Sequence, residues 1–192
     1  MKKKVLYAIV GETCAGKDTV TKILCERFNT KMVVSYTSRK MRSSDKQGVN
    51  HNFVSKQEFD KLILENDVIA YTQTGQDEYC AIVSQLEDAM FYIVNPDGIH
   101  WFNRQDYTDI ELVTFYITLP LDERRLRASK RNDTLAMFKK RVIDEKEDFD
   151  NFALNKEYDY SFVNWSSVQT ADIIEGIIRY LEAKRDKECL DE

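Results

Sequence analysis

The sequence is poor in the residues that interrupt regular structure. Two prolines and six glycines in 192 residues are too few for a disordered or loop-rich chain, because such chains are enriched in one or both. The four cysteines form no Cys-x-x-Cys pair and have no histidine near them. Neither a structural zinc site nor a disulfide framework is therefore expected, and we expect a reduced protein of the cytoplasm.

Long apolar runs and an excess of positive charge are also missing. No run approaches the roughly 18 apolar residues of a membrane span, and the lysines at Lys2–Lys4 are not followed by the apolar segment of a signal peptide. The net charge of −5 argues against a general binder of nucleic acid or anionic membranes. We expect a small-molecule partner, no nucleic acid, no membrane, and a monomer or homodimer.

The chain does have a hydrophobic content of 43%, arranged as strands that alternate with helices. This alternation predicts an α/β fold, a parallel sheet flanked by helices on both faces. The tetrapeptide Asn95–Gly98 is interpreted as a turn that ends a strand, and the middle of the chain is richer in short strands. The expected strands of the main sheet are Val5–Val10, Met32–Tyr36, Phe91–Val94, Leu112–Leu119 and Ser161–Trp165.

The most informative stretch joins the first strand to the first helix. Val5–Val10 is uncharged throughout, as expected for a strand buried on both faces. It runs into Gly11–Lys17, which has the G-x-x-x-x-G-K spacing of a phosphate-binding loop. The apolar residues of the following segment recur at helical spacing, so the loop is predicted to end at a helix N-terminus, where amide groups and the helix dipole favour anions.

This loop predicts the nucleotide site and a position for a metal ion. Lys17 would reach the outer phosphates, and such loops hold Mg²⁺ through a Ser or Thr hydroxyl after the lysine. Here that position is Asp18, and Thr19 comes one step later, so either residue is a candidate metal ligand. The predicted ATP-binding residues of the loop are Gly11, Glu12, Thr13, Cys14, Ala15, Gly16, Lys17, Asp18 and Thr19.

A second group of polar residues follows the second predicted strand. Ser35, Arg39 and Arg42 lie in a basic segment of an otherwise acidic protein. Arginine suits phosphate because its planar fork donates two parallel hydrogen bonds. The alternative interpretation is a solvated surface loop, which is what most runs of charge are.

The order of these motifs resembles that of guanylate kinases. Their phosphate loop precedes S-x-T-x-R-x-x-R, which matches Ser35–Arg42. Later motifs match Gly48–Val54, Glu58–Phe59, Ala70–Tyr71 and Glu78–Cys80. The helical segment Leu121–Asp133 resembles the lid of that family, and Tyr158–Asn164 is similar to a motif near the adenine. The likeness covers roughly residues 5 to 185.

The resemblance implies a P-loop kinase fold in a single domain of residues 1–192. The core would comprise residues 1–35 and 90–192, the inserted acceptor-binding region about 36–89, and a helical lid about 124–150. It also implies a cytoplasmic enzyme that uses ATP and Mg²⁺ to phosphorylate a small phosphorylated acceptor. Catalysis of this kind is mostly positioning and electrostatic stabilisation.

The resemblance also implies roles for individual residues. Lys17, Arg39, Arg131 and Arg141 would be catalytic, with Arg131 and Arg141 closing from the lid; their alternative role is in surface salt bridges. Asn164 would lie near the adenine. The implied acceptor-binding residues are Ser35, Arg39, Arg42, His51, Tyr79 and Asp97.

Three departures from the family pattern concern the acceptor. Ala70 stands where the family has the glutamate that reads guanine, and Ala81 replaces a small hydroxyl residue. Unpaired guanine donors would cost about 1–3 kcal/mol each, so strong guanine preference is not expected. Asp97 and Gln73 are candidate substitutes, and His51 replaces a phosphate-binding tyrosine.

Two alternatives stay open at this stage. Lys17–Asp18 and Asn50–His51 also resemble ribose 1,5-bisphosphate phosphokinases, although Arg42 keeps the nucleotide-kinase pattern. A non-catalytic guanylate kinase-like module that binds phosphopeptides is the alternative of a different class. Such modules usually lose the phosphate loop, which is intact here.

Overall fold

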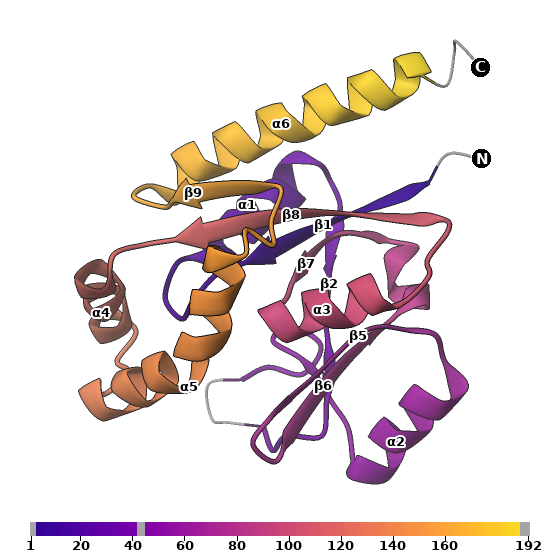
Figure 1. Cartoon of the computed structure of the whole chain (residues 1–192). Coiled ribbons are helices and arrows are strands. Elements are labelled where there is room, and N and C mark those ends of the chain that lie inside the picture. The colour runs from indigo at the N-terminus through magenta and orange to yellow at the C-terminus, as the bar shows by residue number, and fades with distance from the viewer. Residues whose placement is uncertain (1–2, 42–44, 189–192) are drawn as a thin grey trace.

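The computed structural model describes residues 3–41 and 45–188, and its centre is a parallel sheet (Figure 1). Five strands lie in the order β2-β7-β1-β8-β9, and each neighbouring pair is parallel. Their carboxyl ends therefore meet at one edge, the usual place for a ligand in such sheets. The strands are β1 (Lys4–Val10), β2 (Lys31–Val33), β7 (Ala89–Ile93), β8 (Ile110–Thr118) and β9 (Tyr160–Val163).

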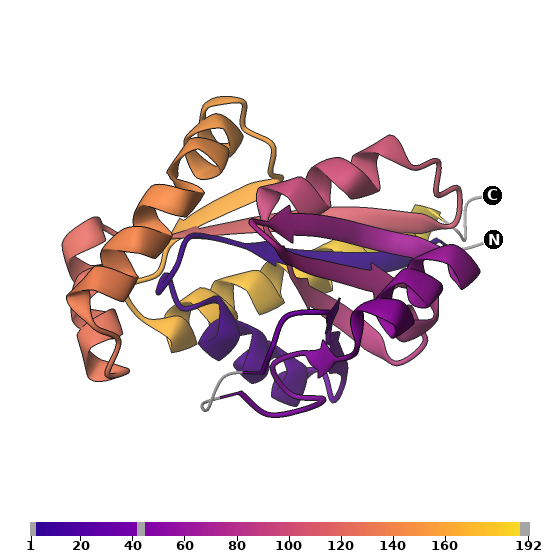
Figure 2. The same ribbon diagram turned by 90° about the horizontal axis from the view of Figure 1, so that it is seen from below.

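Helices cover both faces of this sheet (Figures 1 and 2). On one face, α1 (Lys17–Arg27) and α6 (Ser167–Glu188) pack through a cluster that includes Leu24 and Ile174. On the other, α3 (Pro96–Arg104) and the end of α5 (Leu135–Leu154) contribute Phe102 and Phe152. Each such side chain stabilises the fold by roughly 1.5–3 kcal/mol on burial. The predicted parallel sheet with helices on both faces is confirmed.

A second, smaller sheet lies beside the first and comes from the middle of the chain. Its order is β4-β3-β6-β5, with β3–β4 parallel and the other pairs antiparallel. The helix α2 (Lys56–Glu65) and the 3₁₀ turn η1 (Val83–Leu86) lie within the same stretch of sequence. The strands are β3 (Tyr36–Thr37), β4 (Asn52–Phe53), β5 (Val68–Thr74) and β6 (Asp77–Ile82).

The expected single strand Met32–Tyr36 is wrong, because the structure divides it between the two sheets. β2 ends at Val33 in the parallel sheet, and β3 begins at Tyr36 in the second. Between them, the carbonyl oxygen of Val34 accepts hydrogen bonds from the side-chain amides of Asn52 (2.8 Å) and Gln85 (2.7 Å). Side chains thus replace the strand ladder where the chain crosses from one sheet to the other.

The turn expected at Asn95–Gly98 is instead the start of a helix. The side chain of Asn95 caps α3 by accepting from the amide of Gly98 at 3.1 Å, and Pro96 occupies the first turn. Proline is tolerated there because its missing N–H would have no partner inside the helix. The same residues fit a turn or a helix start, and packing of α3 on β5 decides between them.

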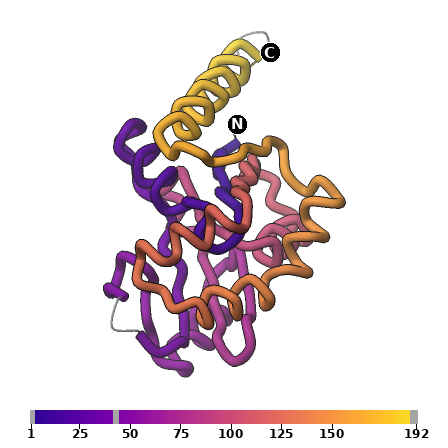
Figure 3. The backbone as a smooth tube through the Cα atoms, turned by 90° about the vertical axis from the view of Figure 1, so that its left-hand side faces the viewer, coloured from indigo at the N-terminus to yellow at the C-terminus, as the bar shows by residue number. Residues whose placement is uncertain are grey.

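Two helices cross the end of the sheet where the carboxyl ends of its strands lie. α4 (Leu121–Lys130) follows β8 directly, and α5 begins after Thr134, whose hydroxyl caps it by accepting from Met137 N at 3.2 Å. Figure 3 views the molecule from this side, with α4 and α5 nearest the viewer. Residues 124–150, the predicted lid, belong to these two helices and the short turn between them.

Candidate active site

The phosphate loop, Gly11–Lys17, leaves β1 at the carboxyl edge of the sheet and needs its two glycines. A Cβ on Gly11 would lie 2.2 Å from the carbonyl oxygen of Ile117, so any side chain there would collide with β8. Gly16 has a φ of 101° and caps α1, a conformation that other residues rarely adopt. The predicted strand, loop and helix are all present.

Lys17 begins α1 and folds back over the loop. Its Nζ donates to the carbonyl oxygens of Gly11 (2.5 Å) and Glu12 (3.1 Å). Burial lowers the pKa of this ammonium, while Asp18 and Glu145 act in the opposite direction. A phosphate group at the loop would favour the charged form of Lys17 and give its donors a stronger acceptor.

Asn164 supports the loop from behind. It is fully buried after β9, and its side-chain amide donates to the carbonyl oxygen of Ala15 at 2.8 Å. Its side-chain oxygen, Oδ1, accepts from the Thr170 hydroxyl at 3.0 Å. The predicted contact with adenine stays a prediction, and what the structure shows is a side chain that positions the loop.

Arg127 also supports the phosphate loop, a role that no sequence pattern indicated. Its Nη1 donates to the carbonyl oxygen of Ala15 at 3.1 Å, and its Nη2 donates to that of Asn164 at 2.6 Å. This arginine therefore joins α4 to the loop and to the end of β9. No sequence pattern indicated this role, because α4 is a charged helix with several arginines. Only the crossing of α4 over the loop distinguishes Arg127 from the others.

A network of charges between the loop and the two helices was also missed. Arg124 of α4 is buried and pairs with Glu12 of the loop at 3.2 Å and with Glu145 of α5 at 3.3 Å. The carboxylate of Glu145 also accepts from the backbone amide of Thr13. Burial raises the pKa of Glu12 and of Glu145, against the lowering effect of Arg124.

The two predicted lid arginines lie on either side of this network. Nη1 of Arg131 is 3.9 Å from the sulfur of Cys14 in the loop. Arg141 pairs with Asp133 at 3.0 Å and lines the cleft described below. Arg131 thus faces the donor loop, and Arg141 faces the acceptor side, although their catalytic roles stay predictions.

On the acceptor side, Arg39 is held in place by protein contacts, but they do not use all of its hydrogen-bond donors. It is buried, pairs with Asp45 at 3.0 Å, and lies over the ring of Phe53 at 5.2 Å. Its Nε is buried without a hydrogen-bond partner among the residues that the structure describes. A phosphate oxygen that reached this donor would satisfy it. The burial of Arg39 makes the solvated-surface interpretation wrong for this residue.

Three other predicted phosphate ligands, Ser35, His51 and Tyr79, lie in or next to strands of the second sheet. Ser35 is within hydrogen-bonding distance of the Tyr92 hydroxyl, at 3.1 Å. The ring of His51 packs on those of Tyr79 and Phe53, with centroids 5.2 and 5.7 Å apart. His51 is thus part of an aromatic cluster, not an isolated loop residue. Arg42 lies outside the described residues.

A cleft of about 850 Å³ separates the second sheet from α5. Tyr79 and Gln73 line it from the second sheet, Asp97 from the start of α3, and Arg141 and Asp148 from α5. Ala70 and Ala81, at 2% and 0% exposure, lie in the core instead. The cleft thus offers carboxylates to an acceptor, while neither alanine replaces the missing glutamate.

Comparisons with known sequences assign this chain to a family. A family model described as guanylate kinase matches residues 3–182 of the chain. The chain belongs to the guanylate kinase family. Guanylate kinases from Vibrio parahaemolyticus and Clostridioides difficile are 27% and 29% identical to it. The alignments cover 98% and 93% of this chain and 94% and 88% of theirs.

A solved structure agrees on the fold of this guanylate kinase family member. The crystal structure of guanylate kinase from Anaplasma phagocytophilum matches with a TM-score of 0.63 at 22% identity, over 94% of this chain and 87% of that one. Together the comparisons confirm the P-loop kinase fold and the enzyme class, an ATP-dependent nucleoside monophosphate kinase. They do not favour a ribose bisphosphate phosphokinase or a phosphopeptide module.

The family implies Mg²⁺, and the residues at the loop fit it. Asp18 and Thr19 lie exposed in the first turn of α1, beside the loop. No group of three or more metal-binding side chains exists among the described residues. One carboxylate or hydroxyl together with substrate phosphates is how enzymes commonly bind this ion. The choice between Asp18 and Thr19 stays a prediction.

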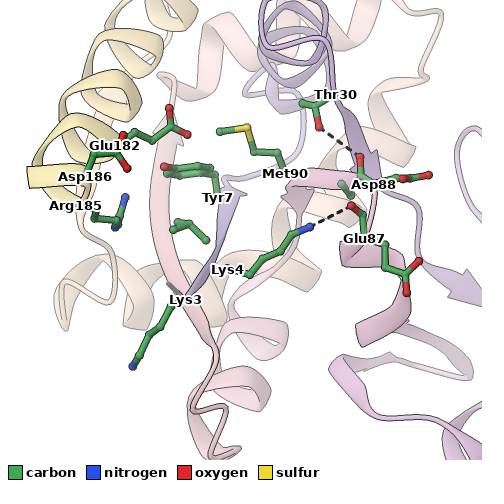
Figure 4. Close-up of a pocket in the computed structure, with 12 residues that line it drawn as sticks. Lys3, Lys4, Tyr7, Thr30, Glu87, Asp88, Met90, Glu182, Arg185 and Asp186 are labelled. Carbon is green, nitrogen blue, oxygen red and sulfur yellow. Dashed lines mark hydrogen bonds between the residues drawn. The ribbon is translucent and has the colours of Figure 1, made fainter. Parts of the chain in front are cut away.

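A second pocket, of about 360 Å³, lies at the opposite end of the sheet, near the N-terminus (Figure 4). Two of its cations have protein partners: Lys4 donates to the Glu87 carbonyl oxygen at 3.2 Å, and Arg185 pairs with Glu111 at 2.5 Å. The pocket adjoins the start of β1, whereas the phosphate loop follows the end of that strand. None of the helices among residues 3–41 and 45–188 has the length and apolar composition of a membrane-spanning segment.

Proposed function

We propose that this guanylate kinase family member transfers the γ-phosphoryl group of ATP to a nucleoside monophosphate bound in the cleft between the second sheet and α5. The observation that carries the proposal is the position of Glu145. This residue lines the cleft and also accepts a hydrogen bond from Thr13 in the phosphate loop. The acceptor cleft therefore reaches the loop, so donor and acceptor phosphates can meet.

The donor side of the proposed reaction uses the loop. Its backbone amides and Lys17 would hold the outer phosphates of ATP, with Asn164 and Arg127 keeping the loop in shape. Mg²⁺ bound at Asp18 or Thr19 would supply charge neutralisation at the phosphates. Fixed donors of this kind act without reorganising during the reaction, which is the main electrostatic contribution in such enzymes.

The acceptor side uses the basic segment after β2. Arg39 would exchange Asp45 for the acceptor phosphate, which would also satisfy its unpartnered Nε. Ser35, His51, Tyr79 and Arg42 are expected to join Arg39 in holding this phosphate. Arg131 and Arg141 would stabilise the charge on the transferred group, so no covalent intermediate or general base is needed.

For the acceptor base, we propose weak discrimination in favour of guanine. The relatives carry the name guanylate kinase, so GMP is the first substrate to test. However, Ala70 and Ala81 are buried and cannot accept from the guanine edge. Asp97 and Gln73 line the cleft and would accept hydrogen bonds from the amino groups of several bases.

The same proposal divides the single domain into working parts. Residues about 36–89 would bind the acceptor, because they form the second sheet and its share of the cleft. Residues about 124–150 would be the lid, because they carry Arg131 and Arg141 and contact the loop. The expectation of a cytoplasmic monomer or homodimer stays a prediction.

A coupled assay of ADP release with all ribo- and deoxyribonucleoside monophosphates tests the proposal, with ribose 1,5-bisphosphate included. We expect Mg²⁺-dependent turnover of GMP and of at least one other monophosphate. A preference for GMP of a thousandfold or more would contradict the proposed weak discrimination. Turnover of ribose 1,5-bisphosphate alone would contradict the nucleotide acceptor.

The variant Lys17→Ala separates a kinase from a binding module. Loss of ATP binding is expected in a kinase, because the ammonium is the main cation of the loop. Lys22→Ala is the matched control, since Lys22 lies exposed on the same helix. A wild-type protein that binds no ATP at millimolar concentration would contradict the proposed kinase activity, and so would a Lys17→Ala protein that binds ATP as well as the wild type does.

A further inference from the structure

One amide of the phosphate loop is already bound to a carboxylate of the protein. The backbone amide of Thr13 donates to both carboxylate oxygens of Glu145, at 2.8 and 3.0 Å. Glu145 lies on α5, 132 residues further along the chain. A carboxylate on a loop amide presents the same chemistry as a phosphate oxygen: an anion that accepts from N–H.

Arg124 holds this carboxylate in place. Its Nη1 is 3.3 Å from Glu145, and its Nη2 is 3.2 Å from Glu12. The arrangement leaves polar atoms unsatisfied, because Nε of Arg124 and Oε2 of Glu12 are buried without a partner among the described residues. A buried polar atom without a partner is unfavourable, so an additional acceptor at Nε of Arg124 would improve this network.

From this geometry, and resting on the proposed function, we infer that Glu145 occupies the place of a donor phosphate oxygen on the amide of Thr13 and leaves it when ATP binds. One N–H group cannot serve both anions at full strength. A polyphosphate beside two carboxylates, Glu12 and Glu145, would also be repelled at short range. Arg124 can exchange Glu145 for the donor phosphate. It can then also donate to that phosphate from Nε, which has no partner among the described residues.

This exchange links arrival of the donor to the acceptor cleft. Glu145 lines the cleft from α5, the helix that also carries Arg141. Release of Glu145 from Thr13 removes a tie between α5 and the loop, which lets α5 adjust to both substrates. Glu145 is thus a positioning residue that lowers ATP affinity in the resting enzyme.

The test measures ATP binding by calorimetry, without acceptor, for the full chain and for Glu145→Ala and Glu145→Gln. We expect Glu145→Ala to bind ATP about tenfold more tightly, since the competing anion is gone. Glu145→Gln keeps the shape without the charge, so it should also bind more tightly. Glu147→Gln, an exposed carboxylate on the same helix, should match the wild type.

The thermal midpoint of each protein without nucleotide provides the second measurement. Both Glu145 variants should melt earlier and yet gain more from added ATP than the wild type does. Alanine removes the bond to Thr13 and the pairing with Arg124, whereas glutamine keeps one neutral acceptor for Thr13 and loses the charge that pairs with Arg124. Variants that melt earlier and bind ATP equally or more weakly would overturn the inference, because Glu145 would then only support the loop. If neither the wild type nor any Glu145 variant bound ATP, the proposed function itself would fail.

Discussion

The side-chain amide of Asn164 donates a 2.8 Å hydrogen bond to the carbonyl oxygen of Ala15, across 149 residues of sequence. Asn164 follows the edge strand β9, and Ala15 lies in the phosphate loop after the central strand β1. A Cβ on the neighbouring Gly16 would come within 2.4 Å of the same amide nitrogen. The loop is therefore shaped by a residue from the far end of the chain.

Replacing Asn164 should loosen the loop and weaken donor binding. Asn164→Ala removes the bonds to Ala15 and Thr170, which should lower the free energy of unfolding by about 1–3 kcal/mol. The carbonyl of Ala15 keeps its bond to Arg127, so the protein should still fold. Urea unfolding and ATP titration check both effects, with the exposed Asn103→Ala as the control. Unchanged ATP affinity would contradict a positioning role.

Loss of Arg39 should act on the acceptor alone. Hydrogen bonds to charged groups contribute about 1.5–3 kcal/mol, so Arg39→Ala should raise the acceptor KM roughly tenfold to a hundredfold. The KM for ATP should stay constant. Steady-state kinetics with GMP measure both, and Lys40→Ala, a change of the exposed neighbour, is the control. A matching rise in the KM for ATP would place Arg39 outside the acceptor site.

Arg131 should matter in the transition state more than in binding. Its guanidinium faces the loop through Cys14, where charge develops on the transferred group. Arg131→Ala should lower kcat by about a hundredfold with little change in either KM. The adjacent Lys130→Ala, also exposed at the end of α4, should be nearly normal. Equal kinetics for both variants would favour the surface salt-bridge interpretation.

The capping box at the start of α2 predicts a pH-dependent stability. The Ser55 hydroxyl and amide donate to Glu58 at 2.7 and 2.8 Å, and these bonds hold the pKa of Glu58 below its ordinary value of 4.5. Their stabilisation is complete above the unfolded pKa and is lost as pH falls through the folded one. Ser55→Ala should therefore lower Tm at neutral pH.

The difference between Ser55→Ala and the wild type should shrink in acid, as Glu58 is protonated in both. Thermal unfolding followed by circular dichroism from neutral pH to about pH 3 measures this, with the exposed Ser84→Ala as the control. A difference in Tm that stays constant over the whole range would mean that Glu58 does not take part in the cap.

Local patterns predicted the elements whose signal lies within a few residues. β1 is buried on both faces, as its uncharged run indicated, and the capping box begins α2 where Ser55 and Glu58 predicted it. The split of Met32–Tyr36 and the helix at Pro96 were missed for a common reason. In both places the local residues fit two conformations, and contacts with Asn52, Gln85 or β5 decide between them.

By itself, the sequence determined the phosphate loop, because spacing of glycines, lysine and flanking apolar residues is enough to specify a strand, an anion-binding turn and a helix. The order of motifs also determined the family. Only the tertiary structure decided which charges meet: Arg124 with Glu12 and Glu145, and Glu145 with Thr13. These pairs depend on how α4 and α5 cross the sheet, and that crossing comes from packing of residues far apart in the chain, which no local pattern encodes.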